Sequence, residues 1–225
     1  DGQWNVMSRR ALLHAGDEIA APVPFPSVIT VGNSTLEVTL HPGTRLKLEA
    51  GKPGQLLSLS IDRGRVGLQR KAGGNNPDGV KIGLSVRGQT AELTLVEPET
   101  QCGLEVVPRP AQGKRPDALA SWPEGGVCVV TGAVRISWAG GEPILVGADI
   151  GWSAWPVPQS AMKVGPMRAV PHWLAPEGTP LTSADKKLHQ LFEKEFATDQ
   201  PVSVSIPALV QDRREGISEF ATETL

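Results

Sequence analysis

Apolar residues occupy every second position between Leu36 and Leu68, and this alternation limits the fold more than any other feature of the chain. A two-residue period is that of β-strands with one face in a core. Groups of glycine and proline interrupt the alternation, and these residues favour the backbone angles of tight turns. We therefore expect a ladder of short antiparallel strands. The apolar positions are Leu36, Val38, Leu40, Leu46, Leu48, Leu57, Leu59, Ile61, Val66 and Leu68, and the expected turns are His41–Gly43, Gly51–Gly54 and Asp62–Gly64.

Similar alternating runs continue to about residue 156, separated by loops rich in glycine and proline. Arg87-Gly88-Gln89 is expected to form the hairpin between two of these runs. Residues 1–156 are therefore predicted to form one mainly β domain. The further strands are expected near Val80–Val86, Ala91–Leu95, Leu104–Val106, Val127–Val130, Val134–Trp138 and Ile144–Trp152.

The pattern changes after Pro156. Residues 157–180 are expected to form a proline-rich linker, which Trp173 and Leu174 anchor on the β domain. Residues 181–225 show helical spacing, so we expect a helical segment that begins a longer helical region. The chain starts without methionine and ends inside a predicted helix, so we expect a fragment whose membrane segment, if the protein has one, lies outside it.

Charge and composition exclude some classes of function. The chain has 22 basic and 24 acidic residues, a net charge of −2, whereas nucleic-acid binding usually needs a clustered basic face. The chain has 25 glycines and 20 prolines, which is typical of either many tight turns or disorder. Its apolar fraction of 40% favours tight turns in a folded chain. The two cysteines, Cys102 and Cys128, fit either one disulfide or two buried thiols.

No set of residues predicts catalysis. The four histidines, His14, His41, His172 and His189, lack the spacing of a metal site. No nucleophile elbow and no phosphate-binding loop occurs in the sequence. We therefore expect no enzyme, no metal and no cofactor.

Four tryptophans lie at or near the end of the β region. Trp138 and Trp152 fit the inward positions of their strands, so we expect them in the core. Trp122 and Trp155 are candidates for an aromatic platform that stacks on a sugar or a peptide.

Two arginines are the other candidate binding residues. Arg63 and Arg65 alternate beside Asp62 at an expected turn. The pattern is typical of solvated surface ion pairs, which contribute little individually. The alternative is a polar patch that contacts a ligand or partner.

Short motifs recur along the β region. Leu13 to Ile19 and Ile144 to Ile150 both read apolar-x-x-Gly-x-acid-Ile, and Gly64 to Leu68 and Gly132 to Ile136 both read Gly-x-Val-x-apolar. In each, glycine is expected to make a turn while alternate residues enter the core. Similar hairpins are therefore expected to recur.

These motifs resemble a known family. The resemblance rests on Gly16-Asp17-Glu18-Ile19, on Leu36–Leu40, on Pro42–Leu48 and on Leu59–Val66, with an echo from Gly132 to Trp152. In this order they resemble the FecR-like domain. With Asp212–Glu215 and the apolar stripe after it, the chain is similar to FecR-like β domains of large planctomycete-type bacterial proteins.

The resemblance implies an antiparallel β-sandwich, a jelly-roll or a β-helix-like domain with a small C-terminal helical segment. It also implies a non-catalytic scaffold in the periplasm, anchored to the membrane in the full-length protein, that contacts a receptor or regulator and transmits a signal. The receptor-contacting and sigma-binding portions of the family have no counterpart here, so the scaffold alone carries over. The alternative hypothesis is a carbohydrate- or cell-surface-binding β-sandwich module.

Overall fold

The structure is a computed structural model, and it describes residues 11–21, 26–72, 77–86, 88–107, 124–138, 141–148, 152–154, 164–166, 170–174 and 190. Within these residues the chain is mainly β, as predicted. The elements are β1 (Glu18–Ala20), β2 (Ser27–Val31), β3 (Leu36–Leu40), β4 (Arg45–Glu49), β5 (Leu57–Arg70), β6 (Val80–Val86), β7 (Gln89–Leu95), β8 (Gln101–Val107), β9 (Glu124–Thr131), β10 (Ala133–Trp138), β11 (Ile144–Gly147), β12 (Trp152–Ala154), β13 (Val164–Gly165) and the 3₁₀ helix η1 (His172–Leu174).

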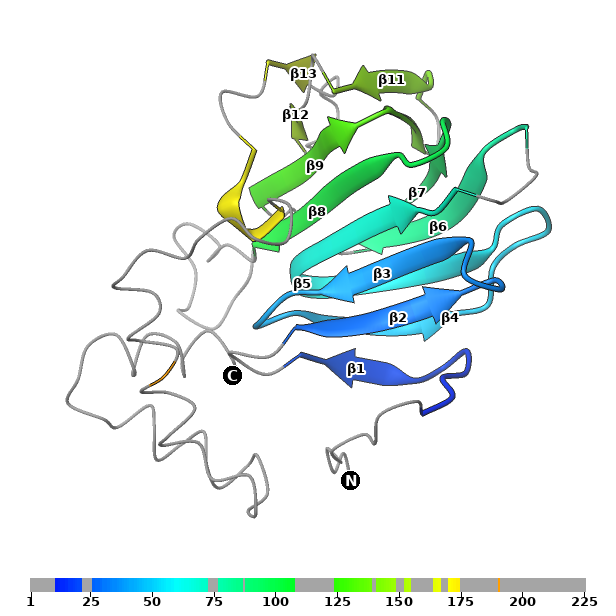
Figure 1. The fold of residues 1–225 in the computed structure, drawn as a ribbon, viewed down its shortest axis with the longest axis vertical. Coiled ribbons are helices and arrows are strands. Elements are labelled where there is room, and N and C mark those ends of the chain that lie inside the picture. The colour runs from blue at the N-terminus through cyan, green and yellow to red at the C-terminus, as the bar shows by residue number, and fades with distance from the viewer. Residues whose placement is uncertain are drawn as a thin grey trace.

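The strands form two layers that share β5 (Figure 1). Sheet A has the order β11-β10-β7-β6-β5-β4-β1. Sheet B has the order β2-β3-β5-β8-β9-β12-β13. The first half of β5 therefore belongs to sheet A and its second half to sheet B.

One hydrophobic core lies between the two sheets. In β3 the alternation is complete, since Leu36, Val38 and Leu40 are fully buried while the residues between them are partly exposed. The apolar positions of β5, β6 and β8 enter the same core. Trp138 packs against it as expected, partly buried.

The expected turn at Asp62–Gly64 is wrong. These three residues lie inside β5, which runs without a break for 14 residues. Gly64 takes a φ of 104°, and the register with β4 shifts beside it, between Arg45 and Leu46. The glycine therefore bends a continuous strand from one sheet into the other instead of reversing the chain.

The passage of β5 between the sheets also explains a parallel strand pair. Residues Leu57–Ile61 of β5 pair in parallel with Ile82–Val86 of β6, whereas the sequence predicts antiparallel neighbours. Parallel strands need a crossover connection. Here the second half of β5 lies in sheet B, so the chain has already left sheet A before it returns as β6.

Other predictions can be checked directly. Val86 pairs with Gln89, so the hairpin predicted between β6 and β7 is confirmed. Two short elements, β13 and η1, lie within the residues predicted as a linker. The predicted helical segment at 181–225 lies outside the described residues, apart from Gln190, which is helical.

The two cysteines are free and buried. On the neighbouring strands β8 and β9, Cys102 is opposite Val129 and Cys128 is opposite Gly103, so the two side chains point to opposite faces of sheet B. This geometry settles the open alternative in favour of two thiols. Burial raises the pKa of the Cys102 thiol, and it raises the pKa of Cys128 to about 11.

A buried arginine ties the two layers together at one end. Arg70, the last residue of β5, is only 3% exposed. Its Nη1 donates hydrogen bonds to the carbonyl oxygens of Leu95 at 3.3 Å and Val96 at 2.7 Å, at the end of β7. The side chain thus joins sheet B to sheet A.

Candidate functional site

The outer face of sheet B carries a strip without side chains. Gly67 of β5 pairs directly with Gly103 of β8, at positions that face away from the core. Glycine inside a strand often marks a place where another segment approaches closely. We call these two residues the glycine seat.

Two side chains of η1 occupy the glycine seat. A Cβ atom on Gly103 would lie 2.5 Å from Cη2 of Trp173 and 2.7 Å from Cδ2 of Leu174. A Cβ on Gly67 would lie 3.5 Å from Cδ1 of Leu174. Leu174 is only 4% exposed, and Figure 1 shows η1, in yellow, beside β8 and β9. The predicted anchoring of this segment by Trp173 and Leu174 is confirmed.

Polar and cationic groups border the seat. The ring of His41 meets that of Trp173 edge to face, with centroids 5.0 Å apart and planes at 72°. The guanidinium carbon of Arg65 lies 6.0 Å from the centre of the tryptophan ring, at the outer limit of a cation–π contact. Nε of Arg65 also donates to Oε1 of Glu105 at 2.8 Å. The side chains of Arg65 and Glu105 are 40% and 22% exposed, so their charges are accessible from solvent.

Backbone geometry fixes the position of Arg65. The hydroxyl of Thr44 accepts a hydrogen bond from the Arg65 amide at 2.9 Å and donates one to its carbonyl at 2.8 Å. The His41 amide donates to the same carbonyl at 3.0 Å. Thr44 is buried, so its two hydrogen bonds to the Arg65 backbone are shielded from water, and Arg65 lies opposite Glu105 on the outer face of sheet B.

Side-chain contacts hold η1 on the glycine seat. Burying one leucine stabilises by about 1.5–3 kcal/mol, and Leu174 is almost fully buried. The aromatic contacts of Trp173 add about 1 kcal/mol.

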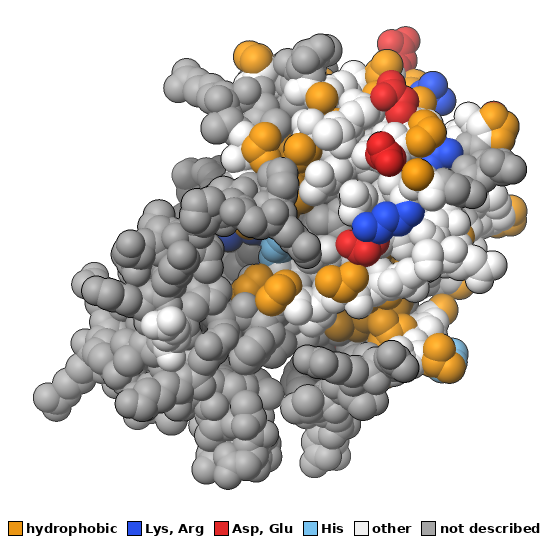
Figure 2. Space-filling model, viewed as in Figure 1, with side chains coloured by type: hydrophobic (Ala, Val, Ile, Leu, Met, Phe, Trp, Pro, Cys, Tyr) orange, Lys and Arg blue, Asp and Glu red, His pale blue; other side chains and the backbone are white. Residues whose placement is uncertain are grey.

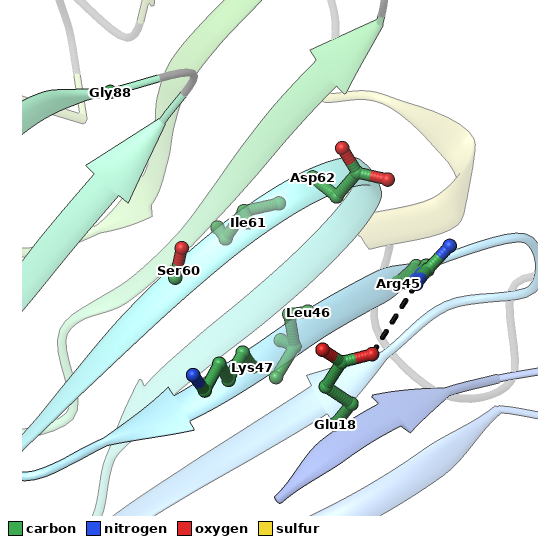
Figure 3. Close-up of a pocket in the computed structure, with 8 residues that line it drawn as sticks. All are labelled: Glu18, Arg45, Leu46, Lys47, Ser60, Ile61, Asp62 and Gly88. Atoms are coloured by element: carbon green, nitrogen blue, oxygen red, sulfur yellow. Dashed lines mark hydrogen bonds and ion pairs between the residues drawn. The ribbon is translucent and has the colours of Figure 1, made fainter. Parts of the chain in front are cut away.

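A second depression lies on the outer face of sheet A (Figure 3). Its volume is about 600 Å³. In it, Arg45 on β4 forms an ion pair with Glu18 on β1, at 3.3 Å between Nη2 and Oε2. The side chains of both residues are about half exposed, so the pair is solvated and weak. The lining residues are Glu18, Arg45, Leu46, Lys47, Ser60, Ile61, Asp62 and Gly88.

The two candidate arginines of β5 belong to different layers. Arg63 is opposite Arg45 in sheet A, and Arg65 is opposite Glu105 in sheet B. Nε of Arg63 is buried and has no hydrogen-bond partner. Arg65 therefore lies beside the glycine seat, whereas Arg63 lies in sheet A, where β4 pairs with β5. The candidate tryptophans Trp122 and Trp155 lie outside the described residues.

Sequence reasoning missed four residues of this site: Gly67, Gly103, His41 and Glu105. A glycine inside each of two apolar strands was the available signal. The pairing itself could not be read from the sequence, since Gly67 and Gly103 are far apart along the chain.

Charged and apolar side chains are mixed on the face of Figure 2, which is viewed from the side of β2, β3 and β8. Acidic and basic side chains lie next to one another, and apolar ones are scattered. Lys71 forms an ion pair with Glu37, with Nζ and Oε2 3.0 Å apart. In the part of the chain that the structure describes, no three His, Cys, Asp or Glu side chains form a group that could hold a metal ion. None of the described helical residues belongs to a helix long and apolar enough to cross a membrane.

Comparison with known proteins gives distant likeness only. No protein-family model matches the chain, and no curated protein matches it. The chain is similar to two crystal structures, at 1.65 Å and 2.50 Å resolution, of a proposed anti-sigma factor from Parabacteroides distasonis. The TM-scores are 0.43 and 0.44, at 11% and 12% identity. Each match covers 67% of this chain and 59% of that chain, so this chain spans less than two thirds of the neighbour's length.

Proposed function

We propose that this β domain is a non-catalytic interaction module of a regulatory or signalling protein, with another protein as its partner. The observation that carries the proposal is the outer face of sheet B. There a strip free of side chains, Gly67 and Gly103, holds a polypeptide segment through Trp173 and Leu174. A face that accommodates one segment of polypeptide has the shape to contact others.

The buried polar groups support this assignment over an enzyme. Among the described residues, the buried polar or charged side chains are Thr44, Arg70, Thr94 and Thr100. Thr44 holds the bend of β5, Arg70 joins the sheets, and Thr100 bonds both backbone groups of Glu97 in a turn. Each of these three groups serves the fold.

The FecR-like resemblance suggests a setting for the module. A location in the periplasm, with a membrane receptor or regulator as partner, is part of this proposal. Carbohydrate binding through Trp122 and Trp155 stays a prediction, because both residues lie outside the described part of the chain.

Affinity capture with two matched variants tests the proposal. Gln101→Arg places a charge on the outer face of sheet B, and Ser85→Arg does the same on sheet A. Each bound protein is identified, purified and titrated against the wild type and both variants. We expect a protein partner whose affinity falls at least tenfold with Gln101→Arg and stays within twofold with Ser85→Arg. Binding of polysaccharides without any protein partner would contradict the proposal, as would a partner that only Ser85→Arg releases.

A further inference from the structure

We propose that the glycine seat is an exchange site, and this rests on the proposed function. In the free protein residues 171–174 occupy the seat. A partner segment that carries an aromatic residue next to a leucine displaces them. The partner is thus identified by its chemistry as a short apolar turn rather than a charged or extended strand.

The shape of the seat selects this partner. The absent side chain at Gly103 leaves room for one flat ring and one branched aliphatic group side by side, and Trp173 and Leu174 fill that room. Gly67 lies beside Leu174 at ordinary contact distance. A larger residue at position 103 would exclude the side chains of Trp173 and Leu174, because its Cβ would lie closer to each of them than normal contact distance.

The border of the seat favours an aromatic residue over an aliphatic one. The edge-on ring of His41 and the guanidinium of Arg65 both face the tryptophan ring. An aliphatic side chain at this place would bury apolar area but would lose both contacts. Glu105 forms an ion pair with Arg65, so the border of the seat has no net charge from these two residues. An uncharged segment therefore fits there without a charge of its own.

The attachment of η1 allows exchange. The backbone hydrogen bond described for this segment is local, from the Leu174 amide to the Pro171 carbonyl at 2.9 Å. In the part of the chain that the structure describes, no strand pairing ties η1 to sheet B. Among the described residues, side-chain contacts therefore hold the segment on the seat, and a competitor that replaces these contacts need not break a strand pairing between them.

A peptide added to the full chain tests the exchange. The probe is a fluorophore-labelled synthetic peptide with the sequence of residues 169–176, AVPHWLAP. The double variant Trp173→Ala/Leu174→Ala removes the side chains that fill the seat, and we call it the vacated chain. The blocked chain carries Gly103→Val in addition to these two substitutions. The control adds Ser85→Val instead, on the outer face of sheet A. We expect saturable binding to the vacated chain, at least tenfold weaker binding to the blocked chain, and no more than a twofold change in the control. Absence of binding to the vacated chain, or equal binding to the blocked chain, would overturn the exchange.

A second measurement uses the wild-type chain, so its result does not depend on whether the variants are stable. In wild-type protein labelled with 5-fluorotryptophan, the resonance of Trp173 is assigned by its loss in Trp173→Phe. Excess unlabelled peptide should move this resonance to its solvent-exposed position, and an unmoved resonance would overturn the exchange. The purified partner of the previous section separates the two proposals. If it binds the blocked and vacated chains equally well, the exchange fails while the interaction module stands.

Discussion

Gly64 and Thr44 touch at the point where β5 passes from sheet A to sheet B. Gly64 has a φ of 104°, and a Cβ atom there would collide with the Cα and side chain of Thr44. Gly16 has nearly the same φ, 103°, but a Cβ on it would meet nothing within 4 Å. Substitutions at the two glycines therefore distinguish two costs. Both positions carry the cost of a positive φ, and only Gly64 also carries the cost of a close contact.

We expect Gly64→Ala to destabilise the protein more than Gly16→Ala does. Both substitutions carry the strain of a positive φ, about 1–2 kcal/mol. The collision with Thr44 should add about 1–3 kcal/mol at position 64. Urea unfolding of both variants measures the difference, and equal losses would mean that the bend of β5 is not packed against Thr44.

The thiols predict a dependence of stability on pH. Burial raises the pKa of Cys128 from about 9 to about 11 and raises that of Cys102 as well, so the folded state holds the thiol protons more tightly than the unfolded state. Their contribution to the free energy of unfolding is complete below about pH 9 and is lost as the pH rises from 9 through 11. Urea unfolding across this range should show a steeper fall for the wild type than for Cys102→Ala/Cys128→Ala. Parallel curves would show that the thiols are not buried.

At the scale of the elements, Arg70 fastens the end of β5 to the end of β7. Arg70→Leu removes the charged donor from the Leu95 and Val96 carbonyls, so we expect a loss of about 2–3 kcal/mol in the free energy of unfolding. Arg135→Leu on β10 is the matched control, because Arg135 is exposed and should change stability by less than about 0.5 kcal/mol. Similar losses for both variants would mean that Arg70 does not join the layers.

Sequence alone located most strands but not their partners. Alternation placed β3, β6, β10 and the hairpin between β6 and β7 correctly, because it reports which side of a strand is buried. It failed at Asp62–Gly64, because a glycine that bends a strand and a glycine that reverses the chain have the same local preference for positive φ. The choice depends on Thr44 and on strands far along the chain.

The candidate site was less predictable than the fold. Arg65 was identified as a candidate from its alternation with Arg63 beside Asp62, but its ion-pair partner Glu105 is 40 residues away, and no local pattern connects them. Trp173 and Leu174 were correctly expected to dock, since large apolar side chains in a proline-rich linker need a place to be buried. The surface on which they dock, the glycine seat, forms only when β5 pairs with β8.

At the scale of the whole molecule, β5 makes the two sheets one unit. Its first half pairs with β4 and β6 in sheet A, and its second half pairs with β3 and β8 in sheet B. Neither sheet can lose β5 without breaking the other, so we expect the β domain to unfold in one transition. Far-ultraviolet circular dichroism and tryptophan fluorescence should then give coincident urea curves after normalisation. Two separated transitions would show that the layers fold independently.

The glycine seat joins this fold to the function that we propose, and nuclear Overhauser effects observe it directly. In isotope-labelled protein, we expect cross-peaks between the Leu174 methyl groups and the Hα protons of Gly67 and Gly103, and between the Trp173 ring and Gly103. Cross-peaks within the core, such as those between Leu104 and Val127, serve as the internal control, because these residues are paired on β8 and β9. Seat cross-peaks beside the core ones would establish that sheet B holds a polypeptide segment on its outer face. Core cross-peaks without any from Trp173 or Leu174 to the seat would contradict it.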